Sequence, residues 1–222
     1  MTRLEPAGKQ FQISKQEVWD AYEKVRSNKG APGVDGQDLE AFETDLKGNL
    51  YKIWNRMSSG TYFPPAVRGV EIPKSDGGIR LLGVPTVADR IAQTVVATRL
   101  TAVVEPVFHE DSYGYRPNRG ALDAVAVCRQ RCWRQPWVVD LDIARFFDTV
   151  EHELLLKAVD KHAPTKWVSL YVRRWLVAPM VMPDGTRVDR DRGTPQGSAI
   201  SPVLANLEGY SERLYLGLCS IR

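Results

Sequence analysis

The spacing of hydrophobic residues predicts a helix near the start of the chain and a second helix soon after it. Apolar residues recur at helical spacing after the capping-box pattern Ser14-Lys-Gln-Glu17, and the pattern ends at Asn28-Lys-Gly30. A turn-rich loop follows, and then a second amphipathic helix, whose apolar positions are Leu39, Phe42, Leu46, Leu50, Ile53 and Met57. Because each helix carries one apolar face, we expect the two to pack together.

Two pairs of extended runs predict β-hairpins. The runs at 67–73 and 78–84 flank Lys74-Ser-Asp-Gly-Gly78, and an Asp-Gly pair between extended runs is typical of a hairpin turn. A second hairpin is expected at 180–188, where the turn is Pro183-Asp-Gly185.

Helices account for most of the remaining chain. We expect a long helix from Thr86, capped by Thr86 and Asp89, to about Val104. Further helices are expected near 121–131, 151–162 and 166–177, and another begins near Ala199 or Ile200. An apolar-flanked strand is predicted from Trp137 to Asp142.

Composition and charge narrow the class of protein only slightly. The chain of 222 residues is 43% hydrophobic and 26% charged, which is typical of a soluble globular protein. Its formal net charge of +3 fits a nucleic-acid partner without requiring one. No segment approaches the roughly 18 apolar residues of a membrane span, and residues 1–10 lack the apolar core of a signal peptide. We therefore expect a cytoplasmic protein.

The cysteines do not predict a metal site. Cys128, Cys132 and Cys219 cannot form a full disulfide framework. Cys128 and Cys132 lie one helical turn apart, but no further Cys or His ligands accompany them as structural zinc requires. We expect reduced thiols.

Acidic residues at the end of the predicted strand indicate a metal site. Asp140 and Asp142 are two residues apart, so strand geometry places them on one face. A carboxylate at the end of a buried strand is costly unless a cation compensates it. Mg²⁺ takes carboxylate oxygens and keeps positions open for substrate phosphates. The alternative is a strand that merely ends in an acidic turn, since short Asp-x-Asp strings are common.

Two further features supply what a nucleotide site needs. The turn Thr194-Pro-Gln-Gly-Ser198 places one long amide side chain between a stiff Pro and a permissive Gly, just before an apolar helix. Arg68, Lys74 and Arg80 lie on the first hairpin, and phosphoryl transfer needs such cations beside the metal. The alternatives are an ordinary loop into a helix and a solvated charged face.

The order of these motifs resembles that of the N-terminal half of a group II intron-encoded reverse transcriptase and maturase. The resemblance rests on Gly30-Ala-Pro-Gly-Val-Asp-Gly36, Ile72-Pro-Lys-Ser-Asp-Gly-Gly-Ile-Arg80, Leu82-Gly-Val-Pro85, Asp89-Arg-Ile-Ala-Gln93, Tyr113-Gly-Tyr-Arg-Pro117, Asp142-Ile143 with Phe146-Phe-Asp148, and Thr194-Pro-Gln-Gly197. It implies an α+β fold, that of a right-hand polymerase, with fingers over residues 1–131 and a partial palm over 132–206. It also implies a nucleotidyltransferase, an RNA-directed DNA polymerase that uses Mg²⁺.

The resemblance assigns roles to individual residues. It makes Asp142 the catalytic metal ligand, with the carbonyl of Ile143 as a second contact to the same metal. The residues expected at the incoming deoxynucleoside triphosphate are Lys74, Arg80, Ile143, Phe147 and Gln196. Those expected at the template or primer are Arg68, Tyr113, Arg116 and Arg119. Phe147 is alternatively a core aromatic beside Phe146, since only one of the two rings can face the site.

The end of the chain departs from the family pattern. Family members continue into a hairpin whose turn carries an aromatic-x-Asp-Asp motif, whereas residues 207–222 contain no Asp. We expect a truncated and catalytically impaired form without thumb or maturase-specific region. Residues 207–222 are typical of an unrelated tail that a frameshift adds. The isolated chain is then expected not to extend a primer, because two-metal catalysis needs shared carboxylates.

Several functions and partners stay open at this stage. Whether the chain is an enzyme is undecided, and the alternatives are a non-catalytic RNA-binding module that assists splicing and a non-functional remnant. The expected partners are intron or template RNA and, in an active protein, deoxynucleoside triphosphates and primer DNA. A palm that lacks its central hairpin leaves an apolar face uncovered. A second copy or a complementing C-terminal half is therefore a further candidate partner.

Overall fold

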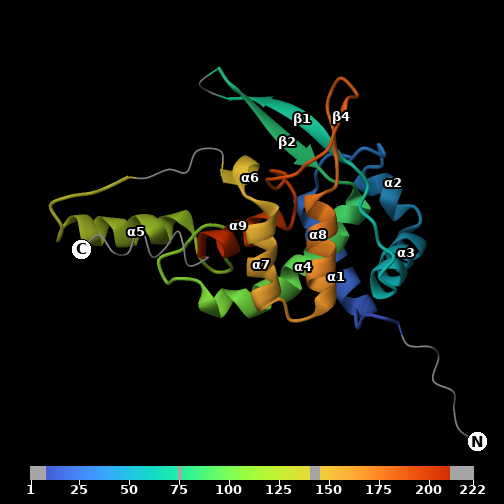
Figure 1. The fold of residues 1–222 in the computed structure, drawn as a ribbon, viewed down its shortest axis with the longest axis horizontal. Helices are drawn as coiled ribbons and strands as arrows, with labels where there is room; N and C mark the ends of the chain where they lie inside the picture. Colours follow the sequence, from blue (N-terminus) through green and yellow to red (C-terminus); the bar gives the residue numbers. More distant parts are fainter. Residues whose placement is uncertain (1–8, 75–76, 141–145, 211–222) are drawn as a thin grey trace, which may run out of the picture.

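Helices surround one central helix, and a small sheet lies at one side of them (Figure 1). The computed structural model describes residues 9–74, 77–140 and 146–210. Its elements are α1 Lys15–Asn28, α2 Leu39–Glu43, α3 Leu46–Ser58, β1 Val67–Pro73, β2 Ile79–Val84, α4 Val87–Val104, the 3₁₀ turn η1 Glu105–Val107, α5 Ala121–Cys132, α6 Phe146–Thr149, α7 His152–His162, α8 Lys166–Leu176, β3 Met180–Val181, β4 Arg187–Val188 and α9 Ser201–Tyr210. The α+β fold expected from the sequence is confirmed.

The first helix follows the sequence closely, whereas the second differs. In α1 the Ser14 hydroxyl accepts a hydrogen bond from the Glu17 amide at 3.1 Å, and the Glu17 carboxylate accepts one from the Ser14 amide at 2.8 Å. The single amphipathic helix predicted from Leu39 to Met57 is wrong, because the chain forms α2 and α3 there. Asp45 leaves helical geometry at φ −125° and caps α3 by accepting from the Gly48 amide at 3.2 Å.

The central helix α4 holds the core together. Its residues Val87, Ile91, Val96 and Leu100 are fully buried. Helices α1, α3, α7, α8 and α9 all pack against it. Burial of one such aliphatic side chain stabilises the fold by about 1.5–3 kcal/mol, so this helix fixes the positions of the elements that carry the candidate site.

The two predicted hairpins are both present, and they join in one sheet. Strands β1 and β2 pair antiparallel, with Ile72 opposite Arg80. Strands β3 and β4 also pair antiparallel, and β3 lies parallel to β1 with Val67 opposite Met180. The sheet order is therefore β2-β1-β3-β4, and it places the tip of the β1–β2 hairpin at the outer edge of the molecule (Figure 1).

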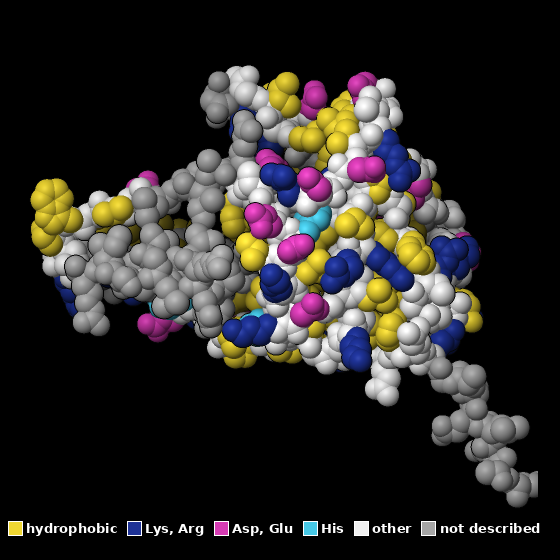
Figure 2. Space-filling view, in the orientation of Figure 1, with side chains coloured by type: hydrophobic (Ala, Val, Ile, Leu, Met, Phe, Trp, Pro, Cys, Tyr) yellow, Lys and Arg dark blue, Asp and Glu magenta, His cyan; other side chains and the backbone are white. Residues whose placement is uncertain are grey.

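The predicted buried strand at Trp137 is wrong for the part that the structure describes. Residues 137–140 form no strand, and the side chains of Trp137, Val138 and Val139 are 86%, 68% and 73% exposed. The preceding helix α5, all of which is described, has no buried residue and projects from the helical body. Figure 2 shows hydrophobic side chains at the tip where α5 ends. A strand needs a neighbour for its backbone groups, and no described strand pairs with this segment.

Two other expectations concern the environment of the protein. Among the helices of the described ranges, none is both long and apolar enough to cross a membrane. Cys128 and Cys132 are exposed free thiols with their Sγ atoms 3.9 Å apart, as expected for reduced cysteines. Cys219 lies outside the described residues.

Candidate nucleotide-binding site

The turn at 193–197 is held between the β1–β2 hairpin and the segment that follows α6. The Gly83 amide of β2 donates to the Gln196 carbonyl at 2.7 Å. On the other side, the Gly193 amide donates to the Val150 carbonyl and the Thr194 amide to the Phe147 carbonyl, both at 2.7 Å. These backbone bonds bring together three segments that are far apart in the sequence.

Glycine is required at the far end of this turn. Gly197 has φ +100°, and a Cβ there would lie 2.7 Å from the Gly83 carbonyl oxygen. A side chain would therefore both strain the backbone and push the turn off β2. This explains why a glycine follows Gln196 in the turn identified from the sequence.

Arg80 and Gln196 meet at the centre of this region. The Arg80 Nε–H donates to the Gln196 side-chain oxygen across 116 residues of sequence. Arg80 is exposed and Gln196 is half-buried, so the pair presents a cation and an amide at the solvent boundary. Both belong to the residues expected at the nucleotide, and the structure brings them together.

Two cations of the hairpin, Arg68 and Arg80, lie on one face of the sheet. Ile72 lies directly opposite Arg80, so their side chains point to the same side of the sheet. Arg68 lies four residues before Ile72 on β1 and therefore also points to that side. Lys74 lies exposed at the hairpin tip, where its amide donates to the Gly78 carbonyl at 2.8 Å. The arrangement suits an extended anion such as a polyphosphate or a nucleic-acid backbone.

Phe147 lies beside the turn that carries Gln196. Its carbonyl accepts from the Thr194 amide, and its ring meets that of Phe146 edge to face at 5.6 Å between centroids. Phe146 packs against the hydrophobic core, while both rings are half-buried. This leaves Phe147 as the better placed of the two for contact with a sugar, and that role stays a prediction.

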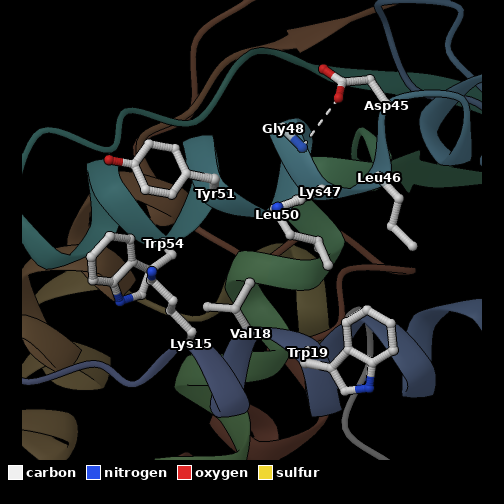
Figure 3. Close-up of a pocket in the computed structure, with 10 residues that line it drawn as sticks. All are labelled: Lys15, Val18, Trp19, Asp45, Leu46, Lys47, Gly48, Leu50, Tyr51 and Trp54. Carbon is white, nitrogen blue, oxygen red and sulfur yellow. Dashed lines mark hydrogen bonds between the residues drawn. The ribbon is translucent and has the colours of Figure 1, made fainter.

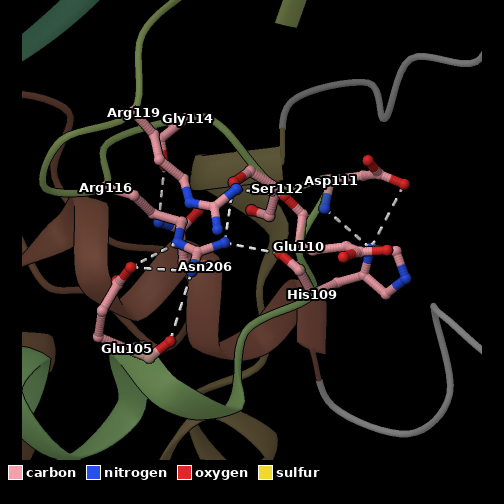
Figure 4. Close-up of polar contacts among 9 residues, drawn as sticks. All are labelled: Glu105, His109, Glu110, Asp111, Ser112, Gly114, Arg116, Arg119 and Asn206. Atoms are coloured by element: carbon pink, nitrogen blue, oxygen red, sulfur yellow. Dashed lines mark hydrogen bonds and ion pairs between the residues drawn. The ribbon is translucent and has the colours of Figure 1, made fainter. Parts of the chain in front are cut away.

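The loop between α4 and α5 is organised around Arg116 (Figure 4). The buried guanidinium donates from Nε and Nη2 to Glu105 Oε1 at 3.0 and 2.8 Å. Its Nη1 donates to the carbonyls of His109 and Ser112 at 2.6 and 2.9 Å. These donors are engaged within the chain, so the geometry favours a loop-positioning role for Arg116. A contact with template or primer stays a prediction for this residue.

Tyr113 and Arg119 form a more accessible pair in the same loop. The Arg119 guanidinium lies 5.7 Å from the centre of the Tyr113 ring, and both side chains are half-exposed. The Asn206 side chain on α9 donates to the Gly114 carbonyl at 2.8 Å. Helix α9 begins directly after the Gln196 turn, so it connects this loop to the nucleotide-binding candidates.

The sequence assigns the metal-ligand role to Asp142 and Ile143. Asp142 and Ile143 lie outside the described residues. Across the described ranges, no group of three or more His, Cys, Asp or Glu side chains is arranged to hold a metal ion. Asp140 is described and is exposed. The expectation of Mg²⁺ therefore rests on Asp142 and on the family, and not on a cluster found in the structure.

A buried polar network behind the turn was missed by sequence reasoning. Asp89, expected to cap α4, instead accepts from the Tyr62 hydroxyl at 2.9 Å, the Trp175 indole at 2.7 Å and the Gln93 amide at 3.0 Å. Only Thr86 caps α4, by accepting from the Asp89 amide at 3.1 Å. Burial raises the pKa of Asp89 to about 6, while these three hydrogen bonds oppose the rise. The only sequence signal was two polar residues four apart on an otherwise apolar helix face.

A separate apolar groove lies between α1 and α3 (Figure 3). It has a volume of about 750 Å³, and its aromatic lining residues are Trp19, Tyr51 and Trp54. The Lys15 ammonium lies over two of these rings, 4.7 Å from the centre of Trp54 and 5.7 Å from that of Tyr51. Aromatic faces beside a cation can contact bases and a phosphate backbone.

Comparison with known proteins identifies the lineage. The family model described as reverse transcriptase (RNA-dependent DNA polymerase) matches residues 72–208, which is more than half of the chain. The chain belongs to the reverse transcriptase family. The match covers the tip of the β1–β2 hairpin, all of β2 and the Gln196 turn, so Lys74, Arg80 and Gln196 lie within it, while Arg68 lies outside.

Individual relatives point to the group II intron branch of this family. The chain is 35% identical over 188 residues to protein YkfC of Escherichia coli, covering 82% of the chain and 49% of YkfC. It is 31% identical to the group II intron-encoded protein LtrA of Lactococcus lactis, covering 84% of the chain and 31% of LtrA. It is 30% identical to the putative COX1/OXI3 intron 1 protein of Saccharomyces cerevisiae, covering 84% and 22%. The chain thus spans half or less of these relatives, and the resemblance to a group II intron reverse transcriptase is confirmed.

Proposed function

We propose that the chain forms the fingers and part of the palm of an RNA-directed DNA polymerase of the group II intron kind. In this proposal residues 1–131 are fingers-like, 132–206 belong to the palm, and 207–222 diverge. The observation that carries it is the Arg80–Gln196 hydrogen bond, which joins the cationic hairpin to the turn before α9. A triphosphate needs several cations and fixed donors around it.

The roles within this site follow from the placement of each residue. Arg80 and Lys74 would bind the triphosphate, Gln196 would orient the nucleotide, and Phe147 would lie against its sugar. Asp142 and Ile143 would hold Mg²⁺, whose charge neutralises phosphate oxygens when the ion is bound. Arg68, Tyr113 and Arg119 are accessible enough to bind template or primer, whereas Arg116 would position the loop that carries Tyr113.

Catalysis by this site would need further polypeptide. The chain spans 49% of YkfC and 31% of LtrA. Helix α5 and residues 137–139 leave several apolar side chains exposed, and exposed apolar surface is typical of interaction sites. We propose that a complementing C-terminal half or a second copy covers these side chains. The 222-residue chain alone is then expected not to extend a primer. Mg²⁺-dependent cDNA synthesis that Asp142→Ala abolishes would contradict this expectation.

Triphosphate binding tests the nucleotide site itself. Arg80→Ala should raise the Kd of a fluorescent deoxynucleoside triphosphate about tenfold or more, because the substitution removes a charge-assisted contact. Arg56 is an exposed arginine on α3, outside the sheet, so Arg56→Ala is the matched control. It should change the Kd by about twofold at most, as expected for a solvated cation away from the site. Equal effects of the two variants would refute the assignment.

A non-catalytic RNA-binding module is the second candidate function. It is favoured by the shared face of Arg68 and Arg80 and by the aromatic groove beside Lys15. RNA affinity that survives Asp142→Ala but falls when Arg68, Lys74 and Arg80 are replaced would support it, with a weaker salt dependence of binding in the variants. If the RNA affinity stays unchanged in all of these variants, the result would count against both functions.

A further inference from the structure

We propose that Asp89 and Gln93 are positioning residues that set the place of the Gln196 turn. The inference rests on the proposed nucleotide site, because its functional value lies in holding Gln196 beside Arg80. It concerns two buried residues of α4 that make no contact with the candidate ligand surface. Hydrogen bonds between described residues lead from Asp89 through Gln93 and Ser198 to the Pro195 carbonyl, which directly precedes Gln196.

The contact with the turn comes from the side chain of Gln93. Its Oε1 accepts from the Ser198 hydroxyl at 2.6 Å and from the Ala199 amide at 2.9 Å. The Ser198 amide in turn donates to the Pro195 carbonyl at 3.2 Å, which closes the turn around Gln196. A displacement of Ser198 would therefore move the backbone that carries Gln196.

The polarity of this network is fixed at both ends. The Ala199 amide and the Trp175 indole are obligatory donors. Since Ala199 must meet an oxygen, Gln93 Oε1 faces the turn and Gln93 Nε2 faces Asp89, to which it donates at 3.0 Å. Asp89 must then accept through both oxygens, because Trp175 donates to the other one at 2.7 Å.

Because Asp89 and Gln93 are buried, a reversed donor or acceptor between them is costly. Asp89 and Gln93 are each only 1% exposed, so water cannot replace a lost partner. Leaving a buried donor or acceptor unpaired costs more than a hydrogen bond normally contributes. A second set of bonds, from Thr194 to Ser201 and from Ser201 to the Pro195 carbonyl, fixes the other side of the turn. The turn is thus held from α4 on one side and from α9 on the other.

Reversing the polarity of the pair provides the test. Asp89→Asn alone sets a donor against the Gln93 amide, and Gln93→Glu alone sets a carboxylate against the Asp89 carboxylate. The double variant D89N/Q93E restores one donor and one acceptor between the two residues, keeps the oxygen that faces Ala199, and preserves the net charge. Ser198→Ala is a milder change, which removes only one bond on the turn side.

Two readouts separate this inference from the proposed function. Hydrogen exchange of a peptide covering 193–200 reports on the turn without any ligand. Each single variant should speed exchange there about tenfold, and D89N/Q93E should return it to within about threefold of the wild type. Ser198→Ala should give a smaller increase, which keeps the test valid if a single variant fails to fold. The Kd of a fluorescent deoxynucleoside triphosphate should follow the same pattern.

The possible outcomes have distinct meanings. Unchanged exchange at 193–200 in the folded single variants, or no recovery in the double variant, would overturn the positioning role while leaving the nucleotide site intact. Altered and rescued exchange in a protein that binds no triphosphate would establish the control of the turn and refute the proposed nucleotide site. Rescue of both exchange and Kd would support both.

Discussion

At the scale of single residues, the environment of Asp89 differs most from what its sequence position suggests. Asp89 lies in the first turn of α4, but its carboxylate is buried and accepts three hydrogen bonds from other side chains instead of capping the helix. Helical spacing identifies Gln93 as its neighbour on the same face, but the partners Tyr62 and Trp175 come from distant segments. Nothing local to the Asp89-Arg-Ile-Ala-Gln93 motif could predict them.

Burial of Asp89 predicts a particular pH dependence of stability. Its folded pKa is raised to about 6 from 3.8, so the folded state binds this proton more tightly and the residue's contribution falls as pH rises from about 4 to 6. Tyr62, whose pKa is raised well above its usual value by burial, stays protonated over this window.

The contribution of Asp89 can be isolated with Asp89→Asn. Carboxylates whose pKa is lowered, such as Glu17 and Asp111, act in the opposite direction but are common to both proteins. Between pH 7 and 4.5, the wild type should therefore gain about 2 kcal/mol in free energy of unfolding relative to the variant, as measured by urea denaturation. If the difference in free energy of unfolding between the wild type and Asp89→Asn does not change with pH, the result would contradict the burial of a charged Asp89.

At the scale of elements, helix caps and turn residues predicted most of the helices and both hairpins. Ser14 and Thr86 cap their helices as expected, because these signals act within a few residues. The break between α2 and α3 was missed, since Asp45 lies within an unbroken helical pattern and its role as a cap competes with that pattern. The parallel pairing of β1 with β3 is a long-range contact, and local sequence does not encode it.

The break at Asp45 has a measurable consequence. Asp45→Ala should lower the free energy of unfolding by about 1 kcal/mol, because it leaves the Gly48 amide without its capping partner. Asp45→Asn retains a capping oxygen and should be close to the wild type. Urea denaturation of the three proteins measures the difference, and an equal loss in both variants would show that charge rather than capping stabilises α3.

At the scale of the whole molecule, the described chain has a well-packed side and an uncovered side. Helix α4 and its neighbours bury the core, whereas α5 and residues 137–139 leave Leu122, Val125 and Trp137 exposed. The apolar pattern at 137–139 predicted a buried strand, but a buried strand needs a neighbouring strand or helix to cover it. The candidate site shows the same limit, since the motifs identified Arg80 and Gln196 but only the fold shows that they meet.

The exposed face predicts self-association of the isolated chain. Replacing Leu122 and Val125 with Lys should lower the average mass at high protein concentration, as measured by size exclusion with light scattering, because charge opposes burial of this face. Val177 is an exposed apolar residue next to α8, and Val177→Lys is the control that should behave as the wild type. A wild-type chain that stays monomeric at all concentrations would contradict this prediction.

The most direct test of the central claim is a double-mutant cycle in triphosphate binding. Arg80→Ala, Gln196→Ala and the double variant are compared by the Kd of a fluorescent deoxynucleoside triphosphate. Because the two side chains form one hydrogen-bonded unit, we expect the double variant to lose about 1 kcal/mol less than the sum of the single losses. Losses that add within about 0.3 kcal/mol, or no loss in either single variant, would show that hairpin and turn do not form one nucleotide site.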